Sequence, residues 1–165
     1  MQVFGLSGVT AIASGGYTAY ALRSDGSVWA WGRGVDGQVG NGAFEDASVP
    51  VRVSGLVGVS AIAGNEGAGY ALYGQGSVWA WGSATSGQLG NGSENSSSVP
   101  VIVSGLMPAK AIAAGGLTAY ALQRDGTVWA WGYGYGATRG PARIEGLAGV
   151  TAIARGGANG YAVRG

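Results

Sequence analysis

The chain has 165 residues, of which 47% are hydrophobic, and its formal net charge at pH 7 is +1. This length and composition allow one domain with a sizeable core, and the balanced charge offers no field that would attract nucleic acid or an anionic membrane. Cysteine and histidine are absent, which excludes disulfides and removes the commonest general base and metal ligand. The sequence shows neither a signal peptide nor an apolar stretch of the roughly 18–20 residues that a membrane helix needs.

A repeat of 50 residues organises the sequence. The tetrapeptide WAWG, which accounts for all six tryptophans, occurs at Trp29–Gly32, Trp79–Gly82 and Trp129–Gly132. A Gly-Leu pair ahead of an Ala-Ile-Ala run begins at Gly5, Gly55, Gly105 and Gly146. The last of these intervals is shorter, because the third copy lacks the segment that reads GQVGNG and GQLGNG in the first two. We therefore expect repeats over 5–54, 55–104 and 105–145, with a half repeat over 146–165.

Each repeat reads as four short strands, and those of the first repeat are expected at Val9–Ala13, Thr18–Leu22, Val28–Trp31 and Pro50–Val53. The Asp25-Gly26 pair predicts a type I′ hairpin turn, which needs positive φ at both central positions. Proline lacks the N–H that a central strand requires, so each proline-started strand is expected at the outer edge of its sheet. The half repeat supplies only the first two strands, Val150–Ala154 and Asn159–Val163.

Four short strands in each unit of about 50 residues are typical of a β-propeller blade. No apolar pattern with the helical period of 3.6 persists for ten positions. The sequence therefore predicts an all-β, single-domain propeller segment of about three and a half four-stranded blades. All six tryptophans are expected to fill the wedges between blades: Trp29, Trp31, Trp79, Trp81, Trp129 and Trp131. The first of each pair, Trp29, Trp79 and Trp129, is expected in an equivalent buried position.

The segment Ala11–Gly42 resembles the repeat of the regulator of chromosome condensation family. The family pattern has an Ala-Gly-rich turn, an Asp-Gly pair, a Trp-Gly strand end and Gly-Gln-Leu-Gly, and the resemblance extends over essentially the whole chain. It departs in the second strand, where Tyr17-Thr18 and Leu117-Thr118 stand in place of the usual histidine. The tail Ala154–Gly165 is also similar to the end of the propeller-type β-lactamase inhibitor protein of the same repeat group.

Members of this family usually close seven blades in one chain, so the resemblance raises the question of how this chain completes its ring. A half blade exposes a strand edge and an apolar face, and such edges attract partners. Three arrangements remain open: a ring closed by self-association of two chains, part of a longer propeller, or a four-bladed ring in one chain. In the first, Gln2–Phe4 would form an outer-strand remnant beside the half blade of the next chain.

Alternate turns of an up-and-down sheet lie at the same end, so the turns after the first and third strands share one rim. Loops on a rigid scaffold commonly carry binding, and tyrosine and arginine are frequent at interface hot spots. The candidate binding residues on this rim are Tyr17, Arg33, Asp36, Glu66, Leu117, Tyr133, Tyr135 and Arg155.

The expected function is that of a non-catalytic scaffold that uses no cofactor and binds another protein, or a second copy of itself, but no nucleic acid and no membrane. No metal is expected, because Asp36 is replaced by Ser86 in the second repeat and calcium needs six to eight oxygens. Two alternatives remain open: a protein inhibitor like the β-lactamase inhibitor, and a hydrolase or lyase that uses acidic residues.

Overall fold

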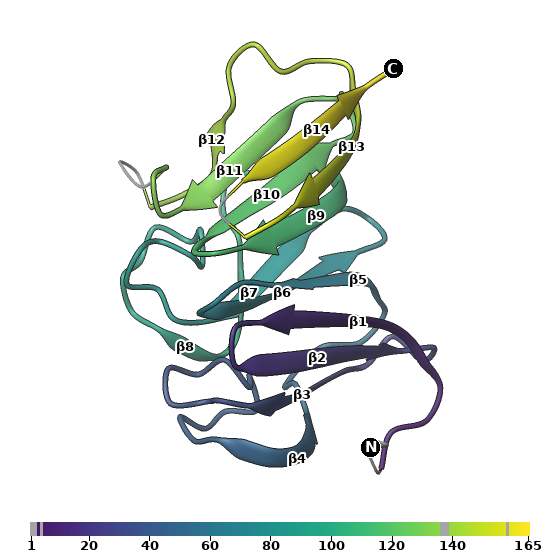
Figure 1. The fold of residues 1–165 in the computed structure, drawn as a ribbon, viewed down its shortest axis with the longest axis vertical. Coiled ribbons are helices and arrows are strands. Elements are labelled where there is room, and N and C mark those ends of the chain that lie inside the picture. Colours follow the sequence, from purple (N-terminus) through teal and green to yellow (C-terminus); the bar gives the residue numbers. More distant parts are fainter. Residues whose placement is uncertain (1–2, 4, 136–138, 158) are drawn as a thin grey trace.

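The computed structural model describes residue 3 and residues 5–135, 139–157 and 159–165. Four antiparallel sheets follow one another along the molecule from the N-terminal to the C-terminal end (Figure 1). All elements within these residues are strands, which confirms the predicted all-β propeller segment. No helix among them is long and apolar enough to cross a membrane.

Three sheets are four-stranded blades whose strands pair in chain order. The first blade contains β1 (Val9–Gly15), β2 (Thr18–Arg23), β3 (Val28–Gly32) and β4 (Ala47–Arg52). The second contains β5 (Val59–Gly64), β6 (Ala68–Tyr73), β7 (Val78–Gly82) and β8 (Ser97–Ile102). The third contains β9 (Ala109–Gly115), β10 (Thr118–Gln123), β11 (Val128–Gly132) and the short β12 (Ala142–Arg143).

The fourth sheet is a half blade of two strands, β13 (Val150–Arg155) and β14 (Gly160–Arg164). The first strands of successive sheets, β1, β5, β9 and β13, lie next to one another and form the inner side of the segment. The proposed outer-strand remnant at the N-terminus involves Gln2 and Phe4, which lie outside the described residues.

The outer-edge position predicted for the proline-containing strands is confirmed, but their expected starts are wrong. Strands β4 and β8 begin three residues before Pro50 and Pro100. The pairing of β3 with β4 is irregular between Ala30 and Gly32, and that of β7 with β8 is irregular at the same place. An irregular edge strand accommodates proline because the missing N–H interrupts no regular ladder.

The Asp-Gly turns are bulged three-residue loops in place of the type I′ turn that we expected. Gly26 has a φ of +74°, but Asp25 is not among the described residues with positive φ. The amide of Gly26 donates to the Arg23 carbonyl at 2.9 Å, and the amide of Arg23 donates to the Ser27 carbonyl at 3.0 Å. This is a three-residue hairpin loop with a glycine bulge, and the Asp25 carboxylate stabilises it by accepting from the Ser27 amide at 2.9 Å.

The core lies between the blades, and the second tryptophan of the second and third blades fills it. Trp81 and Trp131 are fully buried in the clusters that join the first blade to the second and the second to the third. Trp29, Trp79 and Trp129 are half-buried rather than buried. They occupy equivalent positions as the second residue of β3, β7 and β11, near the hairpin turn that precedes each of these strands.

Candidate functional site

Five of the eight candidate rim residues line one open cleft of about 600 Å³. They come from all three blades, which the sequence places far apart: Tyr17, Arg33, Asp36, Glu66 and Leu117. The side chain of Tyr17 is 79% exposed at the mouth of this cleft. The turns after the first and third strands therefore meet at one surface, which we call the rim cleft.

Backbone hydrogen bonds fix the turns that carry these side chains. The Arg33 amide donates to the Tyr17 carbonyl at 3.0 Å, which joins the two turns of the first blade. The Glu66 amide donates to the Gly116 carbonyl at 2.8 Å, which joins the turns of the second and third blades. Because the backbone is held within and between blades, the rim side chains project from a rigid base.

The charges in the rim cleft are unevenly paired. The Arg33 guanidinium lies 3.4 Å from the Asp36 carboxylate, and the amide of the buried Gln38 side chain donates to the same carboxylate at 3.0 Å. The Glu66 carboxylate is exposed and has no hydrogen-bond or ion-pair partner among the described residues. The cleft therefore presents one neutralised ion pair and one free negative charge.

The second blade adds polar residues to the rim cleft that the candidate set did not include. Gln88 is buried, and its side-chain oxygen accepts from the Ser86 amide at 2.7 Å. The hydroxyls of Ser83 and Thr85 lie 3.2 Å apart on the same wall. The repeated Gly-Gln-Val/Leu-Gly sequence was the available signal for Gln88, since the same position in the first blade is Gln38.

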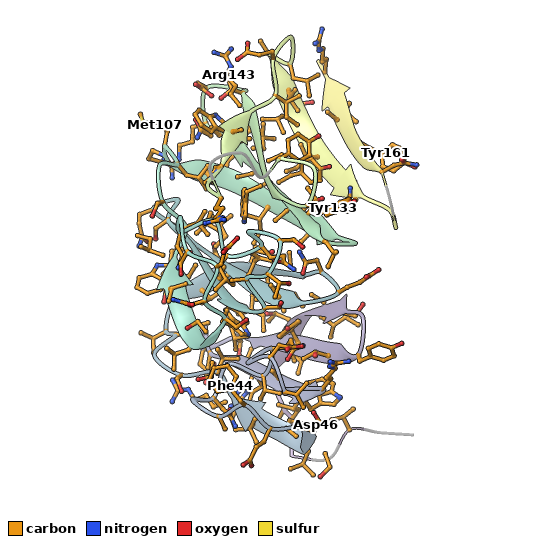
Figure 2. All side chains as sticks on the ribbon, turned by 90° about the vertical axis from the view of Figure 1, so that its left-hand side faces the viewer. Phe44, Asp46, Met107, Tyr133, Arg143 and Tyr161 are labelled. Carbon is orange, nitrogen blue, oxygen red and sulfur yellow. The ribbon has the colours of Figure 1, made fainter. Side chains whose placement is uncertain are left out.

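Tyr133 lies apart from the rim cleft. It lines a separate hollow of about 340 Å³ with Glu94 and Arg139, whose side chains form an ion pair at 2.5 Å. Figure 2 labels Tyr133 in the upper half of the molecule, above the first blade that carries Phe44 and Asp46. Among the described residues the two hollows share only Thr85 in their linings, so the rim has two adjacent hollows rather than one.

Tyr135 and Arg155 do not line the rim cleft, because both pack against neighbouring residues of the fold. The Arg155 side chain donates to the Gly115 carbonyl at 3.0 Å and to the Tyr120 hydroxyl at 3.1 Å. Tyr135 meets Tyr120 edge to face with ring centroids 6.2 Å apart. Burial raises the pKa of Tyr120 above its ordinary value.

The rim cleft brings side chains of different chemistry together. It combines an exposed tyrosine, an aliphatic side chain, an arginine and carboxylates, and of these tyrosine and arginine are the types enriched at interface hot spots. Among the described residues, no group of three or more Asp or Glu side chains is positioned to hold a metal ion.

Comparison with protein families identifies the repeat. The family model described as "Regulator of chromosome condensation (RCC1) repeat" matches residues 25–67 and 75–122, and a second model of the same description matches residues 9–38. The human regulator of chromosome condensation is 44% identical over 48 residues, which cover 29% of this chain and 11% of that protein.

Solved propellers have the same fold. Human WBSCR16 superposes with a TM-score of 0.84 at 26% identity, covering 99% of this chain and 46% of that chain. Yeast RCC1 (Prp20), solved in complex with Kap60, gives 0.81 at 23% identity, covering 93% of this chain and 41% of that chain. Prp20p from Saccharomyces cerevisiae gives 0.80 at 25% identity, covering 93% and 43%. This chain thus spans less than half the length of each, and it belongs to the regulator of chromosome condensation (RCC1) repeat family.

Proposed function

We propose that this chain is a non-catalytic protein-binding scaffold that binds its partner at the rim cleft. The observation that carries the proposal is the convergence of Tyr17, Glu66 and Leu117, one from each blade, on a single open cleft. Interfaces are commonly anchored by an exposed aromatic residue beside charges that set orientation. Among its structural relatives, yeast Prp20p is described with binding properties to Gsp1p and histones, and it was solved bound to Kap60.

The test is a binding assay with purified proteins: Gsp1p, core histones and a panel of β-lactamases. We expect at least one of them to bind, and we expect the double variant Tyr17→Ala/Glu66→Lys to weaken that binding at least tenfold. The control is Val57→Ala/Met107→Ala, which changes two residues that are similarly exposed but belong to the connectors between blades. Binding that the control abolishes and the rim variant preserves would contradict the proposal.

The assay also separates the two alternative functions. Inhibition of a β-lactamase that disappears in the Tyr17→Ala/Glu66→Lys variant would identify the scaffold as an inhibitor acting through the rim cleft. Turnover of a glycan or ester substrate that is lost in Asp36→Asn or Glu66→Gln would show a hydrolase or lyase and overturn the scaffold proposal.

We further propose that the chain associates with itself through its two end sheets. Apolar side chains are exposed on the outward face of the first blade and on that of the half blade, among them Ile12, Tyr161 and Val163. Light scattering at micromolar concentration is expected to give the mass of two chains. The mass of one chain would contradict self-association and leave the longer propeller or the four-bladed ring.

A further inference from the structure

The two boundaries between complete blades share one arrangement of side chains. At the first, Trp81 meets Tyr20 edge to face with ring centroids 5.6 Å apart, and at the second Trp131 meets Tyr70 at 5.9 Å. In each case the tyrosine belongs to the earlier blade and the tryptophan to the later one. Every blade therefore has a tyrosine face, which points toward the next blade, and a tryptophan face, which points toward the previous one.

The first blade exposes its tryptophan face. Trp31 stands opposite Ala19 on the neighbouring strand, as Trp131 stands opposite Ala119 in the third blade. Ile12 on this face is 80% exposed, whereas its equivalent in the second blade, Ile62, packs against the core of the first boundary. The face borders an open hollow of about 490 Å³ whose lining contains no charged side chain.

The half blade exposes its tyrosine face. Tyr161 and Val163 are 58% and 59% exposed, whereas their equivalents in the first blade, Tyr20 and Leu22, are buried at the first boundary. Ala152 of β13 is also exposed, and its equivalent in β1 packs against the same core cluster. Figure 2 shows Tyr161 on the half blade, at the opposite end of the molecule from Phe44 and Asp46 of the first blade.

We infer that the tyrosine face of the half blade binds the tryptophan face of the first blade of a second copy, with Trp31 of one copy against Tyr161 of the other. This inference rests on the proposed self-association and specifies its geometry. The occupant is identified by complementarity: the first blade exposes a tryptophan face, and the half blade presents the tyrosine side of two strands that correspond to β1 and β2, the strands that carry Tyr20 at the first boundary. A contact between two tryptophan faces would bring Trp31 against Trp31 and reproduce neither boundary.

A head-to-tail contact of this kind also determines the symmetry of the assembly. Each copy that binds through one face leaves its other face available, so the contact repeats until the assembly closes into a ring. Two copies joined by two identical junctions form the smallest closed assembly, and they cover all four exposed faces.

The absence of cysteine allows the junction to be tested by site-specific cross-linking. At the first boundary, a Cβ built on Gly64 would lie 2.9 Å from the Ser14 carbonyl oxygen and 2.9 Å from the Tyr20 ring. Ser14 is the equivalent of Gly64 on the exposed tryptophan face, and Gly156 lies beside Tyr161 on the exposed tyrosine face. The variants Ser14→Cys and Gly156→Cys therefore place one thiol on each side of the inferred junction.

We expect a short bismaleimide to join Ser14→Cys chains to Gly156→Cys chains when the two are mixed, and neither variant to cross-link with itself. Gln75→Cys, on an exposed turn of the second blade, is the control and is expected to cross-link with neither. Self-cross-linking of a single variant, or no cross-linking in the mixture, overturns the inference. If the cross-linking fails in this way but the wild-type chain has the mass of two chains, the chain self-associates through a contact other than Trp31 against Tyr161.

Substitution at the junction provides a second readout. Trp31→Ala and Tyr161→Ala are each expected to weaken the association of two chains at least tenfold, measured by sedimentation equilibrium. Tyr161 is exposed in the single chain, so its removal leaves the fold intact. Association that neither substitution weakens would also overturn the inference.

Discussion

Tyr20 and Trp81 donate hydrogen bonds to the same backbone carbonyl, that of Gln38, at 3.0 Å and 2.8 Å. Their rings meet at an interplanar angle of 82°, an edge-to-face arrangement. The Tyr70 hydroxyl and the Trp131 indole repeat this at the Gln88 carbonyl, at 2.8 Å and 2.9 Å. The Gly-Gln-Val/Leu-Gly loop therefore ties two blades together, in addition to lining the rim cleft.

The buried tryptophans are expected to dominate stability. Trp81→Ala leaves a cavity between two blades and is expected to lower the free energy of unfolding by about 3–5 kcal/mol. Trp79→Ala, on the same strand but half-buried, is the matched control and is expected to cost clearly less. Urea denaturation measures both, and equal losses would contradict a core that lies between blades.

The hydrogen bond of the indole can be separated from its packing. Trp81→Phe keeps an aromatic ring beside Tyr20 but removes the donor to the Gln38 carbonyl, which retains its bond from the Tyr20 hydroxyl. Because that carbonyl stays partly satisfied, the lost bond is expected to contribute about 1 kcal/mol, with the smaller ring adding to the loss. If Trp81→Phe lowers the free energy of unfolding as much as Trp81→Ala does, the hydrogen bond contributes more to stability than the packing of the ring.

The glycine of the bulged turn is expected to tolerate no side chain. Gly26 has a φ of +74°, and a Cβ there would lie 2.6 Å from the Gly58 amide nitrogen in the connector to the next blade. Gly42 has a φ of +96° with nothing within 4 Å of its Cβ position, so it serves as the control. Gly26→Ala is expected to lower the melting temperature more than Gly42→Ala, because it combines backbone strain with a clash. The reverse order would contradict the close approach of the two loops.

Acid is expected to weaken the bulged turns. Hydrogen bonds from the Ser27 hydroxyl and amide lower the pKa of Asp25, and Thr127 lowers the pKa of Asp125 in the same way. A carboxyl with a lowered folded pKa stabilises the fold above its unfolded pKa and loses that contribution as the pH falls through the folded value. The Asp25→Asn/Asp125→Asn variant should therefore be less stable than wild type at neutral pH and approach it as the pH falls below the ordinary carboxyl range. A constant difference across this range, measured by urea denaturation, would contradict the prediction.

High pH is expected to destabilise the fold through the tyrosines buried at the blade boundaries. Burial raises the pKa of Tyr20 and of Tyr70 far above the ordinary value. A raised folded pKa means that the unfolded chain ionises first, so stability is retained below about pH 10 and lost as the pH rises beyond it. Tyr70→Phe removes this ionisation along with the bond to Gln88, so its stability deficit should shrink between about pH 8 and pH 11. A deficit that grows over this range would be inconsistent with the buried phenol.

The strands were predictable from the sequence because their signals are local. The alternation in Thr18–Leu22 and the Trp-Ala-Trp pattern after Asp25-Gly26 each describe one hairpin, and the observed strands β2 and β3 begin at the predicted residues. The turn type was wrong, because the Asp25 carboxylate binds the Ser27 amide and so favours the bulged loop over a type I′ turn. That competition between a side chain and the backbone is not visible in the Asp-Gly pair alone.

The sequence by itself determined the all-β character, the blade repeat and its half-blade end, since strand period and turn residues act within about 50 residues. Tertiary structure decided which tryptophan of each pair is buried, because that depends on how far the neighbouring blade reaches across the sheet. It also decided that Tyr17, Glu66 and Leu117 share a cleft whereas Arg155 instead holds Tyr120. Arg155 and Tyr120 are 35 residues apart and successive cleft residues about 50, so only the rotation between successive blades brings them together.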